Sequence, residues 1–133
     1  MNTPDEQMDR QHIFAVNGSP DFLDLLRELL QQEDYNVTTT NFVPKTFDQI
    51  AALTPSLLLI DLVVGQHVGW DLLERLGKGA STRGIPVIVV STSPQLLEEA
   101  QADPARFGGQ GFLCKPFDLD DLLTMVSDLI GPA

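Results

Sequence analysis

Uninterrupted runs of apolar residues alternate along this chain with stretches in which apolar residues recur at every third or fourth position. An apolar run without alternation predicts a strand that is buried on both faces, as in the interior of a parallel sheet. Residues 57–60 and 85–90 fit this pattern, and residues 12–16 and 112–114 repeat it over shorter lengths. Residues 35–40 are polar at alternate positions, which predicts a strand near the sheet edge.

A stretch with helical spacing follows each predicted strand. The first helix is expected to open at Asp21, with an apolar stripe made of Phe22, Leu25, Leu26, Leu29 and Leu30. A short helix begins near Pro44, and a third covers residues 70–76 and is ended by Gly77 and the region of Gly79 and Gly84. A fourth starts after the N-cap Ser93 and stops before Pro104. The last starts near Asp118, with a buried face made of Leu119, Leu122, Leu123, Val126 and Ile130.

Five strands that alternate with five helices predict an α/β fold, in which a parallel sheet is covered by helices on both faces. A chain of 133 residues has the length of one such domain. We therefore expect a single domain over residues 12–133, preceded by a flexible tail at residues 1–11.

The charge of the chain excludes several classes of function. Eight Lys and Arg residues against nineteen Asp and Glu residues give a formal net charge of −11, which argues against binding to nucleic acid or to an anionic membrane surface. Neither a membrane-spanning run nor a secretory signal is apparent in the sequence. The single cysteine, Cys114, has no partner for a disulfide within the chain and is expected to be a buried small apolar residue. We expect a cytoplasmic protein.

Polar residues stand where four of the predicted strands end, at Asn17, Asp61, Ser91 and Lys115. The carboxyl ends of parallel strands share one edge of the sheet, so these side chains are expected to converge there. A carboxylate can act as a nucleophile toward phosphorus, an ammonium group can hold a phosphate, and a hydroxyl can hydrogen-bond to its oxygens. The default interpretations are a helix cap for Asp61 or Ser91 and an exposed lysine beside a turn for Lys115.

These residues, in this order, resemble the receiver domains of two-component response regulators. The resemblance extends from Ile13 to Ile130 and rests on Asp61 after an apolar strand, Gly69 eight residues later, the run that ends at Ser91, and Lys115 before Pro and Phe. It implies a flavodoxin-like (βα)5 fold with three layers. It also implies a part in phosphorelay signalling.

By resemblance, Asp61 is the phosphoacceptor and Ser91 is the hydroxyl that contacts the phosphoryl group. Lys115 becomes the cation of the site, with a cis bond to the proline that follows it. Phe112 stands at the aromatic switch position of the family, but it offers no hydroxyl.

The sequence departs from the family at the end of the first strand, where adjacent acidic residues usually help to hold Mg²⁺. Here those positions are Asn17 and Gly18, which together also read as an ordinary tight turn. Only Asp61, the Asn17 amide oxygen and the Val63 carbonyl remain as ligands, so we expect weak Mg²⁺ binding or none. The charges of Asp61 and Lys115 alone sum to zero, and phosphate transfer and retention are expected to be low.

Three kinds of function remain open: a phosphorelay receiver, a binding or dimerisation module that works without phosphorylation, and, ranked last, a small α/β enzyme or nucleotide binder. We expect no enzyme, because no phosphate-binding glycine loop follows the first strand. A receiver would take its phosphate from a histidine kinase or a phosphotransfer protein. By resemblance, its partner or second copy would bind the face made by the fourth helix, fifth strand and fifth helix, where Met125 and Leu129 either contact the partner or widen the core.

Overall fold

The computed structural model describes residues 11–41, 45–104 and 109–131. Its centre is a five-stranded sheet in the order β2-β1-β3-β4-β5, and every neighbouring pair of strands is parallel. The strands are β1 (His12–Val16), β2 (Asn36–Thr40), β3 (Leu57–Leu62), β4 (Val87–Ser91) and β5 (Gly111–Cys114). All six residues of β3 are buried, and β2 lies at one edge of the sheet, as the sequence predicts.

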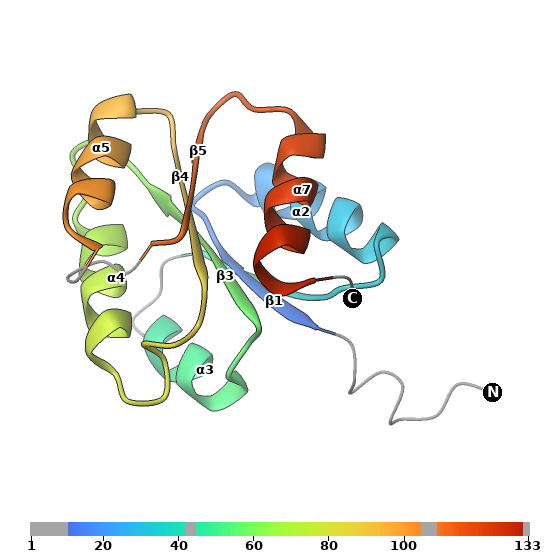
Figure 1. Ribbon diagram of the computed structural model, residues 1–133, viewed down its shortest axis with the longest axis horizontal. Coiled ribbons are helices and arrows are strands. Elements are labelled where there is room, and N and C mark those ends of the chain that lie inside the picture. The colour runs from blue at the N-terminus through green and yellow to red at the C-terminus, as the bar shows by residue number, and fades with distance from the viewer. Residues whose placement is uncertain (1–10, 42–44, 105–108, 132–133) are drawn as a thin grey trace.

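Helices cover both faces of the sheet and complete a three-layer α/β fold (Figure 1). One layer holds α2 (Pro20–Gln32) and α7 (Leu119–Ile130). The other holds α3 (Thr46–Leu53), α4 (Val68–Lys78) and α5 (Pro94–Ala102). The predicted start of a helix at Pro44 and ten of the eleven residues of the predicted tail lie outside the described residues.

Alternate side chains of the strands point into two separate cores. Leu57 and Leu59 of β3 pack toward α2 and α7, whereas Leu58 and Ile60 pack toward α3, α4 and α5. Asp61 continues this alternation, which directs it toward the side of α2 and α7. The buried strand thus delivers a carboxylate to one chosen face of the molecule.

Two sequence predictions about burial were wrong or incomplete. Helix α2 buries Leu26 and Leu30, as predicted, and Phe22 and Leu29 pack against the same core. The predicted stripe missed the buried Leu23 and wrongly included Leu25, which is 44% exposed. Cys114, the last residue of β5, is exposed and not buried as predicted. Helix α4 ends in the predicted glycine region: it continues through Gly77 and ends at Lys78, with Gly79 as its C-cap.

The carboxyl end of α7 is hydrogen-bonded to residues that directly precede β1 and β2. Tyr35 donates a hydrogen bond of 2.8 Å to the carbonyl oxygen of Gly131, and Gln11 donates one to the carbonyl oxygen of Ile130. Met125 and Leu129 are half-buried and pack against the core, and a Cβ atom at Gly111 would lie 2.5 Å from the Met125 sulfur. The packing of these two side chains therefore favours a widened core stripe.

Among the described residues, no helix combines the length and the apolar character that crossing a bilayer requires.

Candidate functional site

Asp61 stands at the carboxyl end of the central strand, where the sequence placed it. It is the fifth residue of β3 and pairs in register with Val90 of β4, and it is only 7% exposed. The chain turns close beside it, because a Cβ atom at Gly69 would lie 2.8 Å from the Asp61 carbonyl oxygen. Gly69 therefore allows α4 to approach the strand end, which accounts for a glycine at this position.

Lys115 reaches Asp61 from the end of β5. Its Nζ lies 3.1 Å from Asp61 Oδ1, and the two side chains are 20% and 8% exposed. The Lys115–Pro116 bond is cis, as the family resemblance implied. The sequence thus correctly predicted that these two strand ends would converge.

Two effects act in opposite directions on the pKa of the Asp61 carboxyl group. Burial raises the pKa of Asp61 above its ordinary value, and the nearby Lys115 charge and hydrogen bond lower the pKa by less. The net direction is upward. The pair is therefore a nearly closed ionic contact in which the carboxylate has little access to water.

Asn17 forms the neighbouring part of the site. It is 4% exposed, and its side-chain Oδ1 accepts a hydrogen bond of 2.8 Å from the backbone N–H of Ser19. Gly18 adds no side chain. This turn caps the start of α2, so the ordinary interpretation of these two residues as a tight turn is confirmed.

The residues at this edge do not fit a Mg²⁺ ion. Asp61 is the one carboxylate at the ends of β1 and β3, and it is already paired with Lys115. The Asn17 oxygen serves the turn, and the Val63 carbonyl accepts a hydrogen bond of 3.1 Å from the N–H of Gln66. Within the described part of the chain, no three His, Cys, Asp or Glu side chains gather as metal ligands. Mg²⁺ prefers several oxygen ligands with at least one free carboxylate, which this set lacks.

Ser91 and Phe112 lie on the other face of the sheet. Ser91 is fully buried, donates a hydrogen bond of 2.6 Å to the Leu62 carbonyl and accepts one of 3.1 Å from the N–H of Ser93. Phe112 packs with the core of α3, α4 and α5. The structure therefore brings together Asp61, Lys115 and Asn17, whereas the Ser91 hydroxyl is engaged by backbone groups of Leu62 and Ser93.

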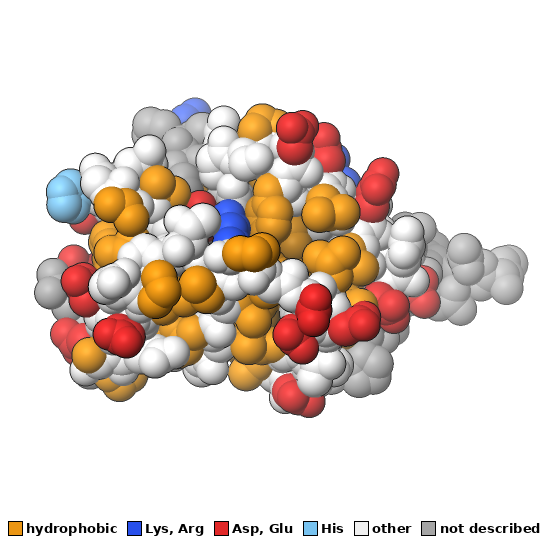
Figure 2. Space-filling model, turned by 90° about the horizontal axis from the view of Figure 1, so that it is seen from above, with side chains coloured by type: hydrophobic (Ala, Val, Ile, Leu, Met, Phe, Trp, Pro, Cys, Tyr) orange, Lys and Arg blue, Asp and Glu red, His pale blue; other side chains and the backbone are white. Residues whose placement is uncertain are grey.

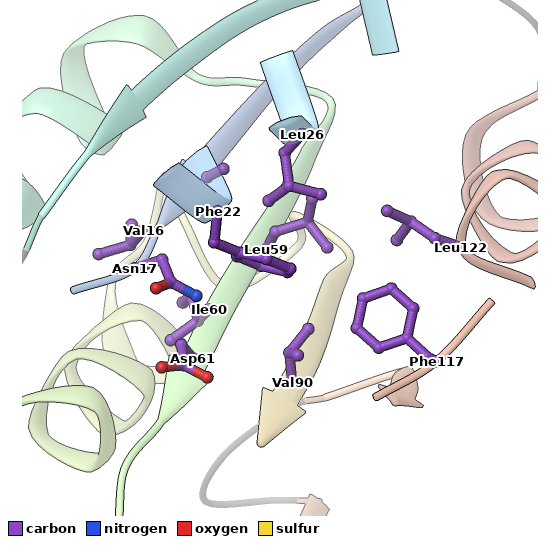
Figure 3. A pocket seen from close by; sticks show the side chains of 11 residues that line it. Val16, Asn17, Phe22, Leu26, Leu59, Ile60, Asp61, Val90, Phe117 and Leu122 are labelled. Atoms are coloured by element: carbon purple, nitrogen blue, oxygen red, sulfur yellow. The ribbon is translucent and has the colours of Figure 1, made fainter. Parts of the chain in front are cut away.

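Two aromatic residues complete the site and were not assigned to it from the sequence. The Phe22 ring centroid lies 4.2 Å from Lys115 Nζ, and the Phe22 and Phe117 rings meet edge to face at 6.2 Å. Figure 3 shows both rings around a small cavity that also borders Asn17 and Asp61. Phe22 lies in the first turn of the helix that follows β1, and this position could have indicated from the sequence that its ring lies near the site.

The surface around the site is mainly apolar and includes the Lys115 side chain. An open groove beside the site is lined by Phe22, Leu25, Thr92, Lys115, Pro116, Phe117 and Leu119. Figure 2 looks onto this edge of the sheet and shows hydrophobic side chains around a basic one, with acidic side chains toward the margins. The exposed side chain of His67, in the loop after β3, has no metal-binding company among the described residues.

Curated proteins with similar sequences include response regulators and a sensor histidine kinase. The chain is 26% identical to the DNA-binding dual master transcriptional regulator RpaA of Synechocystis over 89% of this chain and 48% of that protein. It is 28% identical to the sensor histidine kinase TmoS of Ectopseudomonas mendocina over 96% of this chain and 13% of that protein. It thus spans half or less of these relatives, but 97% of the protein PilH of Pseudomonas aeruginosa, at 26% identity.

Solved structures agree with this fold. A response regulator protein from Burkholderia multivorans superposes with a TM-score of 0.71 at 27% identity, over 93% of this chain and 98% of that one. The N-terminal domain of the nisin resistance regulator NsrR superposes with a TM-score of 0.76 at 26% identity, over 92% and 99% of the two chains. Residues 13–127 match the response regulator receiver domain family, and the chain therefore belongs to this family of two-component signalling domains.

Proposed function

We propose that Asp61 is the phosphoryl acceptor of this receiver domain, and that Lys115 is the cation that compensates its charge. The observation that carries the proposal is a buried carboxylate at the end of the central strand with an ammonium group 3.1 Å away. In this proposal the domain is a substrate of phosphotransfer and does not turn over a separate substrate of its own.

The transfer step uses groups that are present at this edge. An Asp61 carboxylate oxygen attacks the phosphorus of a phosphohistidine and forms a P–O bond. The P–N bond breaks, its electron pair returns to the imidazole nitrogen, and the ring, already protonated on its other nitrogen, leaves as neutral imidazole. The phosphoryl group adds about one to two negative charges, of which Lys115 neutralises one.

Magnesium contributes little in this proposal. Asp61 is engaged by Lys115, and the oxygens of Asn17 and Val63 accept backbone hydrogen bonds. When Mg²⁺ is bound in a receiver, it supplies positive charge to the phosphoryl oxygens. This chain would rely on Lys115 for that charge, so we expect slow transfer that depends weakly on Mg²⁺.

The test is phosphorylation by a small donor. The protein is incubated with acetyl phosphate, with Mg²⁺ in one sample and EDTA in the other, and the gain of one phosphoryl group is followed by intact mass. We expect slow modification whose rate changes by less than about threefold between the two samples. Modification that is fast and complete with Mg²⁺ but absent with EDTA would overturn the metal-independent part of the proposal.

Two carboxylate variants assign the modified residue. Asp61→Asn should abolish the mass gain. Asp71→Asn, an exposed acid of α4 on the other side of the β3–α4 loop, should leave the mass gain unchanged. If Asp61→Asn still gains mass, the acceptor is another residue.

A second function is favoured by the closed pair itself. With Asp61 neutralised by Lys115 and no fitting metal ligands, the domain is electrostatically complete without phosphate. It would then act as a binding or dimerisation module that needs no phosphorylation. If no donor modifies Asp61 and the Asp61→Ala variant keeps its partner or self-association, this function replaces the first.

The partners in this proposal are a histidine kinase or phosphotransfer protein and a downstream protein or second copy. A hollow beside β5 is lined by residues of the strand, the following loop and α7: Phe112, Leu113, Cys114, Pro116, Phe117, Asp118 and Asp121. It supports the β5 and α7 part of the proposed face of α5, β5 and α7 as the downstream contact. We propose a cytoplasmic location, because a lone exposed Cys114 suits a reducing compartment.

A further inference from the structure

We infer that Phe22 is a positioning residue that holds the Lys115 ammonium group against Asp61. This inference rests on the proposed role of Asp61 and Lys115 in accepting a phosphoryl group. Phe22 itself touches neither the carboxylate nor the phosphoryl group in this assignment. It acts through Lys115.

The geometry places the ammonium group between two partners. Lys115 Nζ lies 3.1 Å from Asp61 Oδ1 and 4.2 Å from the centroid of the Phe22 ring. A cation at this distance over a ring is attracted by the negative charge on the ring face. The Lys115 side chain is only 20% exposed, so water screens this attraction less than it would at the open surface.

The ring is itself held in place. Phe22 lies in the first turn of α2, where its backbone N–H donates to the N-cap Ser19 Oγ at 3.4 Å. Phe117 meets the Phe22 ring at an interplanar angle of 86°, an edge-to-face arrangement that is favourable for aromatic pairs. The cation therefore rests on a ring that is anchored by both a helix cap and an aromatic neighbour.

The need for such a ring follows from the missing carboxylates. Lysine carries its charge on a flexible stem with several rotatable bonds, and fixing that stem costs conformational entropy. Within the described ranges, Asp61 is the one carboxylate paired with Lys115, and Asn17 brings no charge. The Phe22 ring adds a second attraction and narrows the positions open to the ammonium group.

A merely structural role for Phe22 makes different predictions. The side chain is half-buried and also packs against the core of α2 and α7. Packing requires an apolar side chain of suitable volume, whereas positioning of Lys115 requires an aromatic face. Phe22→Leu and Phe22→Met keep the first property and remove the second, and Phe22→Tyr keeps both.

The first measurement is the proton chemical shift of the Lys115 Cε methylene in full-length protein, which a nearby ring face moves upfield. We expect this upfield shift in the native protein and in Phe22→Tyr, and its loss in Phe22→Leu and Phe22→Met. Retention of the shift in Phe22→Leu, with the fold intact by its backbone spectrum, would overturn the inference.

The second measurement is the rate of Asp61 phosphorylation by acetyl phosphate. We expect Phe22→Leu and Phe22→Met to lower the rate by about threefold to tenfold and Phe22→Tyr to stay within about twofold of the native protein. In a Lys115→Met background, Phe22→Leu should change the residual rate by less than about twofold. Equal losses in both backgrounds would show that Phe22 does not act through Lys115.

A second cation-and-ring pair supplies the matched control. The Arg75 guanidinium carbon lies 4.2 Å from the centroid of the Phe47 ring, between α4 and α3. Phe47→Leu removes a contact of the same kind away from Asp61. It should leave the phosphorylation rate unchanged, and an equal loss in this variant would contradict a specific role for Phe22.

The two measurements also separate this inference from the proposed function. If the native protein is never phosphorylated, the acceptor assignment fails, and the chemical shifts still decide whether Phe22 holds Lys115. If the native protein is phosphorylated but Phe22→Leu is as fast as the native protein, the acceptor assignment stands and the positioning role fails.

Discussion

The turns after β1 and β4 share the same local hydrogen-bond pattern. In each, the last polar residue of the strand end accepts a hydrogen bond from the backbone of a serine two residues later: Asn17 from Ser19 at 2.8 Å, and Ser91 from Ser93 at 3.1 Å. Each of these serines is the N-cap of a helix, and the first residue of each helix is a proline. Backbone angles at the two caps are nearly identical, with φ −104° in both.

The two turns differ in the face of the sheet that they serve. Asn17 borders the same cavity as Asp61, whereas Ser91 points to the opposite side and braces β3 by its hydrogen bond to the Leu62 carbonyl. A local sequence pattern thus specifies a turn, and the alternation of the strand decides whether the polar residue joins the site. The comparison also explains why the site lacks a full set of metal ligands, because the Asn17 oxygen that a cation would need already accepts a hydrogen bond within the turn.

The largest expected effect comes from giving the first turn the acidic pair that the family resemblance implies. In Asn17→Asp with Gly18→Asp, Mg²⁺ affinity should rise by about a hundredfold, because two carboxylates join Asp61. A Cβ atom at Gly18 meets nothing within 4 Å, so the new side chain fits. Titration of Mg²⁺ against Trp70 fluorescence and thermal midpoint measures the gain, with Gly18→Asn as the uncharged control. An unchanged Mg²⁺ response would contradict our account of the missing metal site.

Lys115→Met tests the pair that the first turn borders. The unpaired Asp61 carboxylate should destabilise the fold by about 2–3 kcal/mol near pH 7.5. Burial raises the folded pKa of Asp61 above its unfolded value, so the folded state gains a proton more readily, and this cost should shrink as pH falls toward the unfolded pKa. Urea unfolding at pH 7.5 and pH 4 measures both effects.

Lys78→Met provides the control for that variant. Lys78 pairs with Glu74 at 3.8 Å and is 76% exposed, so its removal should cost less than about 0.5 kcal/mol at either pH. A loss for Lys115→Met that is no larger, or that grows as pH falls, would contradict a buried Asp61–Lys115 pair.

Ser91→Ala tests the bracing role of the second turn. The change leaves the Leu62 carbonyl and the Ser93 N–H without their buried partner and should cost about 2 kcal/mol of unfolding free energy. Ser127→Ala is the matched control, because its hydroxyl also donates to a backbone carbonyl, that of Thr124 at 3.1 Å, but is exposed. A similar small loss in both variants, measured by urea unfolding, would mean that Ser91 does not brace β3.

The smallest effects are expected at the two helix caps. Ser93→Ala should cost about 1 kcal/mol, because Ser93 Oγ accepts from the half-buried N–H of Leu96 at 3.3 Å. Ser19→Ala should cost less, because its bond to the Phe22 N–H is longer, at 3.4 Å, and exposed. Chemical denaturation of both variants gives the order, and a larger loss for Ser19→Ala would reverse this part of the comparison.

Much of the fold was predictable from patterns that are local in the sequence. The apolar run of β3, the proline after the Ser93 cap and the start of α7 near Asp118 all depend on neighbours in the chain. The exposure of Leu25 and Cys114 was not predictable in this way, since it depends on which elements cover them. The polar residues at the strand ends were predicted as one group, but the structure divides them between two faces.

The sequence by itself determined the order of strands and helices, the position of Asp61 at a strand end and its convergence with Lys115, because parallel strands carry their carboxyl ends to one edge. Only the tertiary structure decided that the ammonium of Lys115 lies between Asp61 and the ring of Phe22, two residues that are far apart in sequence. The physical reason is that helix α2 packs on the face toward which Asp61 points. The spacing of residues along the sequence does not give the distance between side chains on separate elements.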